Sequence, residues 1–371
     1  MSRTKNTLAT AAALLVASIT TAPTARANPP TLEIEGVLRG DVLVRRNTQG
    51  KIRDEASSPE SFVRLSSQLS EHIRVAVALE LTRTLREDGK WTEQDALDIN
   101  ALLREASIEI HDVGGVPVAF VVGKHEIAFG QALAAMPAYT RSPLYSTQSV
   151  NRVMGLTVRL DERIFDIIHS IEASVFSSES DSPILTQAKP GRIDSASVRI
   201  RGELFEGLQF QASAMHLGNR HLGNEASEQR YSVGLIYQDP QGHWMAWIEG
   251  IYHADQKNPN FGNNAHFAIT AGASHKVGPG LVVAEVTWIQ NVLLEVGLGY
   301  RLNLSKNVSI GPEIRFTHWS DGASSGGSAR GGSANDLRLA LTVEVLLGPS
   351  VENPEDEVLF GKKPKDQRGR E

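Results

Sequence analysis

The sequence predicts an all-β protein, a transmembrane antiparallel β-barrel of about 16 strands with short periplasmic turns and long extracellular loops. Apolar side chains alternate with polar or small ones from Leu32 to Leu347, at the period of two that marks a strand. The alternating segments are roughly 9 to 14 residues long, which suits strands that cross a bilayer better than soluble strands of about 5 to 6 residues. Short and long connections also alternate, as they do in membrane barrels.

The composition narrows the class of protein. The chain has 371 residues, of which 41% are hydrophobic, and it has no cysteine. The missing cysteines exclude disulfide scaffolds, thiolate zinc sites, iron–sulfur clusters and cysteine nucleophiles. After the first thirty residues no apolar run approaches the roughly 20 residues of a membrane helix. The mean hydropathy of -0.20 still fits a membrane barrel, because half of each strand faces water.

Residues 1–27 have the features of a secretory signal peptide. Two basic residues precede an apolar run, and Ala25-Arg26-Ala27 supplies a small-x-small cleavage pattern. The alternative is an amphipathic N-terminal helix of the mature fold. Removing the leader takes away three of the 37 basic residues and leaves 34 against 43 acidic ones, a net charge of -9. A chain with this charge has no general electrostatic reason to bind nucleic acid.

Sixteen segments carry the alternating pattern, and an even number is typical of bacterial membrane barrels. They are residues 32–44, 63–69, 73–81, 106–110, 118–122, 154–160, 165–175, 193–206, 208–217, 231–237, 243–253, 266–277, 281–290, 292–304, 308–319 and 337–347. The alternative is a soluble sandwich or open antiparallel sheet with one wet face, whose strands also alternate.

The connections divide the chain. Long loops are expected around residues 46–60, 85–100, 130–148, 177–192 and 320–335, with tight turns between them, and only Gln290-Asn291 is short where a long loop is due. The expected organisation is a signal peptide at 1–27, a transmembrane barrel at 28–348 and a charged, flexible periplasmic tail at 349–371. Contact of this tail with peptidoglycan or a periplasmic partner is the alternative.

The two faces of the strands differ in polarity. One face is apolar and includes five aromatic residues, expected as interface anchors: Trp244, Tyr252, Trp288, Tyr300 and Phe316. The other face carries charges that a dry core could not hold without pairing, which indicates a water-filled lumen. The residues expected to line this lumen are Arg74, Glu80, Arg199, Arg201, Glu203, Glu285, Glu295, Arg301, Glu313, Arg315, Arg338 and Glu344. Along all strands, thirteen acidic residues against nine arginines on this face predict a weak cation preference.

The long loop at 130–148 is the third in the barrel, and the third loop of general porins folds inward and narrows the pore. It mixes apolar, aromatic and basic groups, so it could set size and hydrogen-bonding selectivity at a constriction. The candidate constriction residues are Met136, Tyr139, Arg141 and Tyr145. The alternative is a surface lid without contact to the pore.

Catalytic and metal-binding patterns are weak. His125-Glu126 lacks the second histidine that a zinc protease needs, and His216 and His221 alone make a poor zinc site. No serine lies in a nucleophile elbow. We therefore expect no enzyme activity, no cofactor and no metal.

One stretch resembles the legiobactin-receptor-type siderophore porins. It comprises Arg104 to Ile110, Val122-Gly123-Lys124, Ala128-Phe129-Gly130 and Ser142-Pro143-Leu144. The family has proline where this chain has Ala128 and aspartate where it has Ser142. The resemblance is detailed over residues 100–160 and implies a sixteen-strand outer-membrane channel for an iron chelate or another small solute.

The leading hypothesis is a passive or facilitated diffusion channel in the cell outer membrane. Its expected partners are outer-membrane lipid, a small-molecule solute and the barrel-assembly machinery, and the oligomeric state stays open between monomer and homotrimer. A non-transporting barrel that acts as a surface anchor, adhesin or scaffold is the second hypothesis. A soluble periplasmic or secreted β protein is the third.

Overall fold

The computed structural model describes residues 31–47, 52–57, 61–81, 84–85, 103–112, 115–130, 150–161, 167–177, 193–218, 227–254, 266–320, 324–325, 328–329 and 334–348. The predicted signal peptide and the predicted C-terminal tail lie outside these residues. So do the candidate constriction residues Met136, Tyr139, Arg141 and Tyr145.

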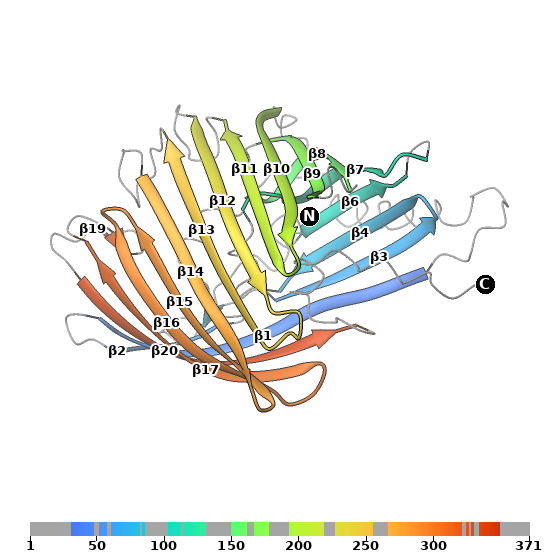
Figure 1. Cartoon of the computed structure of the whole chain (residues 1–371). Coiled ribbons are helices and arrows are strands. Elements are labelled where there is room, and N and C mark those ends of the chain that lie inside the picture. Colours follow the sequence, from blue (N-terminus) through green and yellow to red (C-terminus); the bar gives the residue numbers. More distant parts are fainter. Residues whose placement is uncertain are drawn as a thin grey trace, which may run out of the picture.

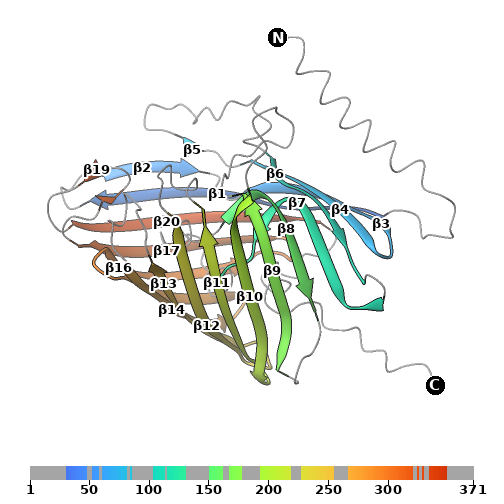
Figure 2. The same ribbon diagram turned by 90° about the horizontal axis from the view of Figure 1, so that it is seen from above.

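Within the described residues, sixteen antiparallel strands form one closed barrel (Figure 1). The strands are β1 (Thr31–Asn47), β3 (Phe62–Ser70), β4 (Ile73–Glu80), β6 (Leu103–Ile110), β7 (Val118–Ile127), β8 (Val150–Leu160), β9 (Ile168–Ser177), β10 (Ile193–Phe205), β11 (Leu208–Leu217), β12 (Glu228–Gln238), β13 (Trp244–Ala254), β14 (His266–Val277), β15 (Gly280–Ile289), β16 (Leu293–Asn303), β17 (Val308–Trp319) and β20 (Ala334–Leu347). Each pairs with the next, and β20 pairs with β1 from Gly36↔Leu347 to Asn47↔Asp336. Figure 2 shows β1 and β20 side by side at this closure. The predicted fold and all sixteen predicted strands are confirmed.

The predicted loop at 46–60 is wrong in part, because Ile52–Ser57 forms a further strand, β2, that pairs with the second half of β1. The first half of β1 pairs with β3, so β2 and β3 together act as one interrupted barrel strand. At the interruption the Ser61 hydroxyl accepts a hydrogen bond from the Arg39 amide at 2.9 Å and donates one to the Arg39 carbonyl at 3.2 Å. This side chain replaces the missing backbone partner. A short strand, β5 (Thr84–Leu85), extends the same region by pairing with β2.

Short connections gather at one end of the barrel. The turns that follow β3, β10, β12, β14 and β16 lie there, together with the start of β1 and the end of β20. At the opposite end β15 and β16 are joined by only Gln290, Asn291 and Val292, as predicted from the sequence. Asn291 adopts a φ of 58°, a left-handed conformation that asparagine tolerates better than most residues. Two very short strands, β18 (Ser324–Ser325) and β19 (Ser328–Ala329), pair within the predicted last loop.

The outer surface of the barrel is an apolar belt. Large apolar side chains on alternate positions of the strands are exposed, and Val233 in the middle of β12 is 64% exposed. Four of the five predicted aromatic anchors are exposed as well: Trp244, Tyr252, Trp288 and Phe316. An apolar surface of this extent is stable when lipid covers it. Among the described residues no helix has the length and apolar character to cross a membrane.

Introducing a charge into the middle of this belt should destabilise the protein. We expect Val233→Arg to lower the free energy of unfolding by about 2–4 kcal/mol, since the arginine must lie at the bilayer midplane. Val277→Arg, at the turn end of β14, should cost only about 0–1 kcal/mol. Urea unfolding in lipid vesicles measures both values. Equal costs at the two positions would contradict a membrane-spanning belt.

Candidate functional site

The charged residues predicted to line a lumen lie on the inward face of the barrel wall. In β16, for example, Glu295 is buried between the exposed outward residues Leu294 and Val296. The same alternation places the predicted residues of β4, β10, β15, β16, β17 and β20 inside: Arg74, Glu80, Arg199, Arg201, Glu203, Glu285, Arg301, Glu313, Arg315, Arg338 and Glu344. Glu203 turns toward the short connection after β10, where it accepts a hydrogen bond from the Gly207 amide at 3.0 Å.

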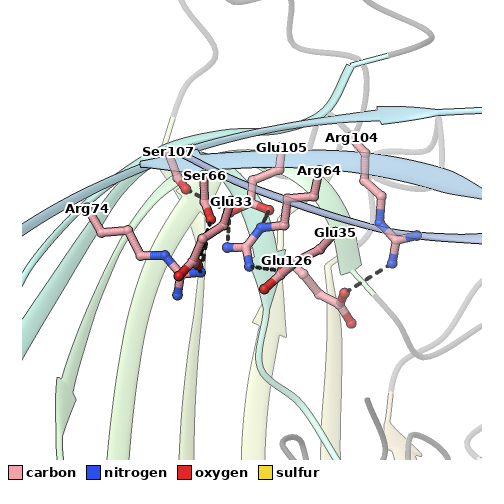
Figure 3. A network of polar contacts seen from close by, with 9 residues as sticks. All are labelled: Glu33, Glu35, Arg64, Ser66, Arg74, Arg104, Glu105, Ser107 and Glu126. Atoms are coloured by element: carbon pink, nitrogen blue, oxygen red, sulfur yellow. Dashed lines mark hydrogen bonds and ion pairs between the residues drawn. The ribbon is translucent and has the colours of Figure 1, made fainter. Parts of the chain in front are cut away.

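One part of the inner surface carries ion pairs that water can reach. We call it the accessible wall and define it by nine residues of β1, β3, β4, β6, β7 and β8: Glu33, Glu35, Arg64, Arg74, Arg104, Glu105, Glu109, Glu126 and Arg159. The exposed fractions of these side chains range from 17% to 54%. Figure 3 shows most of them gathered on the same side of the strands.

Arg64 is the centre of the accessible wall. Its Nε lies 2.9 Å from a carboxylate oxygen of Glu105, and its Nη1 lies 3.4 Å from a carboxylate oxygen of Glu35 (Figure 3). Arg74 reaches Glu33 at 3.4 Å, and both groups contact the Ser66 hydroxyl. Each arginine therefore shares its charge with acidic groups of other strands.

The pairs continue toward both ends of the barrel. On the loop side, Arg104 stacks over the Phe62 ring at 4.6 Å and lies 3.7 Å from Glu126. On the turn side, Arg159 lies 2.9 Å from Glu109 and 2.5 Å from Asp161. Charges of both signs thus follow the accessible wall along the barrel axis.

The inner surface of β15, β16 and β17 is closed to water. Arg315 lies 2.5 Å from Glu313, 2.8 Å from Glu295 and 3.2 Å from Glu285, and all four side chains are at most 3% exposed. Three carboxylates thus share one guanidinium in a dry environment. We call the buried inner surface of β11 to β17 the packed wall.

Further buried polar groups lie on the inner face of the barrel. Glu228 on β12 accepts hydrogen bonds from Arg230 at 2.6 and 3.1 Å and contacts the His253 ring at 2.9 Å. The His253 ring stacks on that of His266, with centroids 4.6 Å apart. At the barrel closure, Glu344 pairs with Arg301 at 2.5 Å and with Arg39 at 2.5 Å. Buried charges of this kind persist because each is paired and hydrogen-bonded.

The packed wall also carries apolar side chains inside the barrel. They form one cluster of buried residues: Ile236, Trp247, Ile251, Ala268, Val283, Ile289, Val292 and Leu293. A second cluster lies beside the packed wall, on β7, β8, β9 and β11, and contains Ile127, Val153, Phe176, Met215 and Leu217. Phe129, two residues after the end of β7, packs against both clusters. Apolar contacts therefore fill part of the space that the sequence predicted to be water.

The chain enters the barrel directly after β7. The Gly130 amide donates a hydrogen bond to the Ser213 hydroxyl of β11 at 3.0 Å, and Arg199 of β10 donates one to the Gly130 carbonyl at 3.2 Å. A Cβ at Gly130 would lie 2.6 Å from Glu249 of β13. These strands are three to six positions away from β7 around the barrel, so only a segment inside the lumen can reach them.

This placement agrees with an inward direction at the start of the predicted third loop. The sequence analysis did not single out Phe129 and Gly130 as inward anchors, although a large apolar residue followed by glycine at a strand end is a usable signal. It also missed the histidines of the packed wall, because nothing local shows that His253 and His266 become neighbours. Among the described residues, no group of three or more histidine, aspartate or glutamate side chains is arranged to hold a metal ion.

No known family model matches the chain, and no curated protein matches it either. Solved structures do. The anion-selective porin from Comamonas acidovorans superposes with a TM-score of 0.59 at 12% identity, over 86% of this chain and 100% of that one. The outer membrane channel DcaP of Acinetobacter baumannii gives 0.56 at 12% identity, over 86% and 97%. The trimer form of OmpT, an outer membrane protein of Vibrio cholerae, gives 0.52 at 11% identity, over 86% and 99%. The chain therefore shares the fold of outer-membrane barrels, and no match supports the siderophore-porin family in particular.

Removing the buried guanidinium should strongly destabilise the packed wall. We expect Arg315→Met to lower the free energy of unfolding by about 3–5 kcal/mol, because three buried carboxylates lose their common partner. Arg74→Gln on the accessible wall should cost at most about 1 kcal/mol. Unfolding in urea at neutral pH measures both. Lowering the pH should restore part of the Arg315→Met loss, because protonation removes the repulsion, and a variant insensitive to pH would contradict this account.

Adding a methyl group at Gly130 should disturb the inward segment. Gly130 has a φ of 65°, and a side chain there would meet the Glu249 carboxylate. We expect Gly130→Ala to lower the free energy of unfolding by about 1–2 kcal/mol. Gly40→Ala is the matched control, since no atom lies within 4 Å of its added Cβ. Equal stability of the two variants would show that Gly130 is not confined as described.

Proposed function

We propose that the protein is a channel for the diffusion of small solutes across the outer membrane. The observation that carries the proposal is a closed barrel with an apolar exterior and an inner wall of charged side chains that water can reach. A barrel of sixteen strands is wide enough to enclose an aqueous passage. The similar structures that are named as a porin and as an outer membrane channel support the same function.

The constriction of this channel would be formed by the loop after β7, with Met136, Tyr139, Arg141 and Tyr145 as its pore-facing residues. The contacts of Phe129 and Gly130 inside the barrel support this part of the proposal. They fix the point at which the loop begins within the lumen. Of the predicted lumen residues, Arg74 on the accessible wall would act on the solute, whereas the buried group around Arg315 would not.

The solute and the assembly state are finer proposals. An iron–siderophore complex as the solute rests on the sequence resemblance alone, and uptake of a radiolabelled iron chelate by vesicles tests it. A homotrimer is supported by the trimer form of the similar OmpT structure, and chemical crosslinking in the membrane tests it. Insertion would require outer-membrane lipid and the barrel-assembly machinery.

A second function is favoured by the packed wall. Buried ion pairs and apolar clusters inside the barrel would also suit a closed, non-transporting barrel that acts as a surface anchor or scaffold. The two functions differ in one readout. A channel gives steady single-channel conductance in planar bilayers, whereas a closed barrel gives none although it migrates on gels as a folded, heat-modifiable protein.

The acidic excess on the inner face should make the channel weakly cation-selective. We expect the reversal potential in a tenfold salt gradient to have the sign for cation preference while staying well below the ideal value, because arginines stand beside the carboxylates. Glu33→Gln should move the potential toward zero. The buried Glu295→Gln is the matched control and should leave it unchanged if folding is retained. A clear anion preference of the unmodified channel would contradict the proposed pore electrostatics.

A further inference from the structure

The ion pairs of the accessible wall and those of the packed wall differ in their exposure to water. On the accessible wall the pairs of Arg64, Arg74 and Arg104 with carboxylates span 2.9 to 3.7 Å, and water reaches both partners. Partly exposed pairs contribute less to stability than fully buried ones, so they exchange one partner for another at lower cost. On the packed wall the Arg315 and Glu228 groups are almost fully buried, and separating them would leave an uncompensated charge. Of the two walls, it is therefore the accessible wall that can offer its charges to a passing solute.

Both signs alternate within short reach on the accessible wall. The strand register sets Glu35 opposite Arg64 across β1 and β3, and Arg74 opposite Glu109 across β4 and β6. The Arg74 guanidinium itself turns to Glu33, two strands away (Figure 3). A solute that touches this wall therefore meets a carboxylate and a guanidinium at neighbouring positions.

The loop after β7 contributes no acidic residues. Residues 128–149 contain no aspartate or glutamate and one basic residue, Arg141. The carboxylates that pair with the arginines of the accessible wall lie on the strands of that wall. A simple cation is attracted by the five carboxylates and repelled by the four arginines of this wall, and the reverse holds for an anion. A molecule that carries both charges can be attracted by both kinds of group at once.

We propose that the accessible wall is a track for small zwitterions, solutes with one carboxylate and one ammonium group such as free amino acids. The solute carboxylate binds Arg64 or Arg74 in place of a wall carboxylate. The solute ammonium binds Glu33, Glu35 or Glu105 in place of an arginine. The inference rests on the proposed channel function and names its substrate class.

Swelling of proteoliposomes tests the proposal with two isomers of equal mass, zwitterionic L-alanine and neutral lactamide. For the unmodified protein we expect alanine to enter at least as fast as lactamide, after subtraction of the rate in protein-free liposomes. The double variant Glu33→Gln/Arg74→Gln removes one exposed pair and leaves the net charge unchanged. It should slow alanine entry about two- to fivefold, the effect of losing weak exposed contacts, and leave lactamide entry unchanged.

The matched control is the double variant Thr270→Val/Thr287→Val on the packed wall. These two hydroxyls lie 3.2 Å apart and are at most 1% exposed, so their loss should alter neither rate. Heat-modifiable migration confirms that each variant is folded. No swelling with either isomer would refute the proposed channel function itself. Two results would refute the zwitterion track alone, provided that lactamide causes swelling. One is that alanine enters more slowly than lactamide through the unmodified protein, and the other is that the charge variant leaves the rate of alanine entry unchanged.

Discussion

Closure of the sheet between β1 and β20 is the constraint on which the rest of the structure depends. Each backbone group left without a partner in hydrocarbon costs several kcal/mol, so a sheet with a free edge cannot span a membrane. The pairs from Gly36↔Leu347 to Asn47↔Asp336 remove that edge. Between β2 and β3, where β1 has no strand partner on that side, the Ser61 hydroxyl hydrogen-bonds both the backbone amide and the backbone carbonyl of Arg39. The barrel thus satisfies its backbone even where its strand pattern breaks.

Closure also decides what each face must carry. With one face in lipid, every charged side chain of a strand has to point inward, and the lumen must accommodate arginines and carboxylates together. The barrel solves this in two ways. Around Arg315 the charges are paired and buried, whereas around Arg64 they are paired but remain in contact with water. The apolar contacts of Phe129, Trp247 and Ile251 belong to the buried part. Water therefore reaches only part of the inner surface.

Much of this architecture could be predicted from the sequence. The period-two alternation predicted the sixteen strands, and the short polar break in it predicted the tight connection at Asn291. Both could be predicted because each depends only on neighbouring residues. The strand β2 was missed because Ile52–Ser57 is a short, mostly polar segment without apolar alternation, although it pairs with the second half of β1 directly before it. Local patterns also could not show that Gly130 meets strands six positions away, or which carboxylates gather around Arg315. These contacts depend on the curvature of the closed sheet.

The central claim is that one inner wall is open to water while the other is packed. The chain contains no cysteine, so a single introduced cysteine can report on its own surroundings. A charged thiol reagent should react quickly with Glu33→Cys and change the single-channel conductance, whereas Thr287→Cys should remain unmodified in the folded protein. The side chain of Glu33 is 51% exposed, and Thr287 is 1% exposed. Equal reactivity at the two positions, with equal effects on conductance, would contradict the division of the lumen.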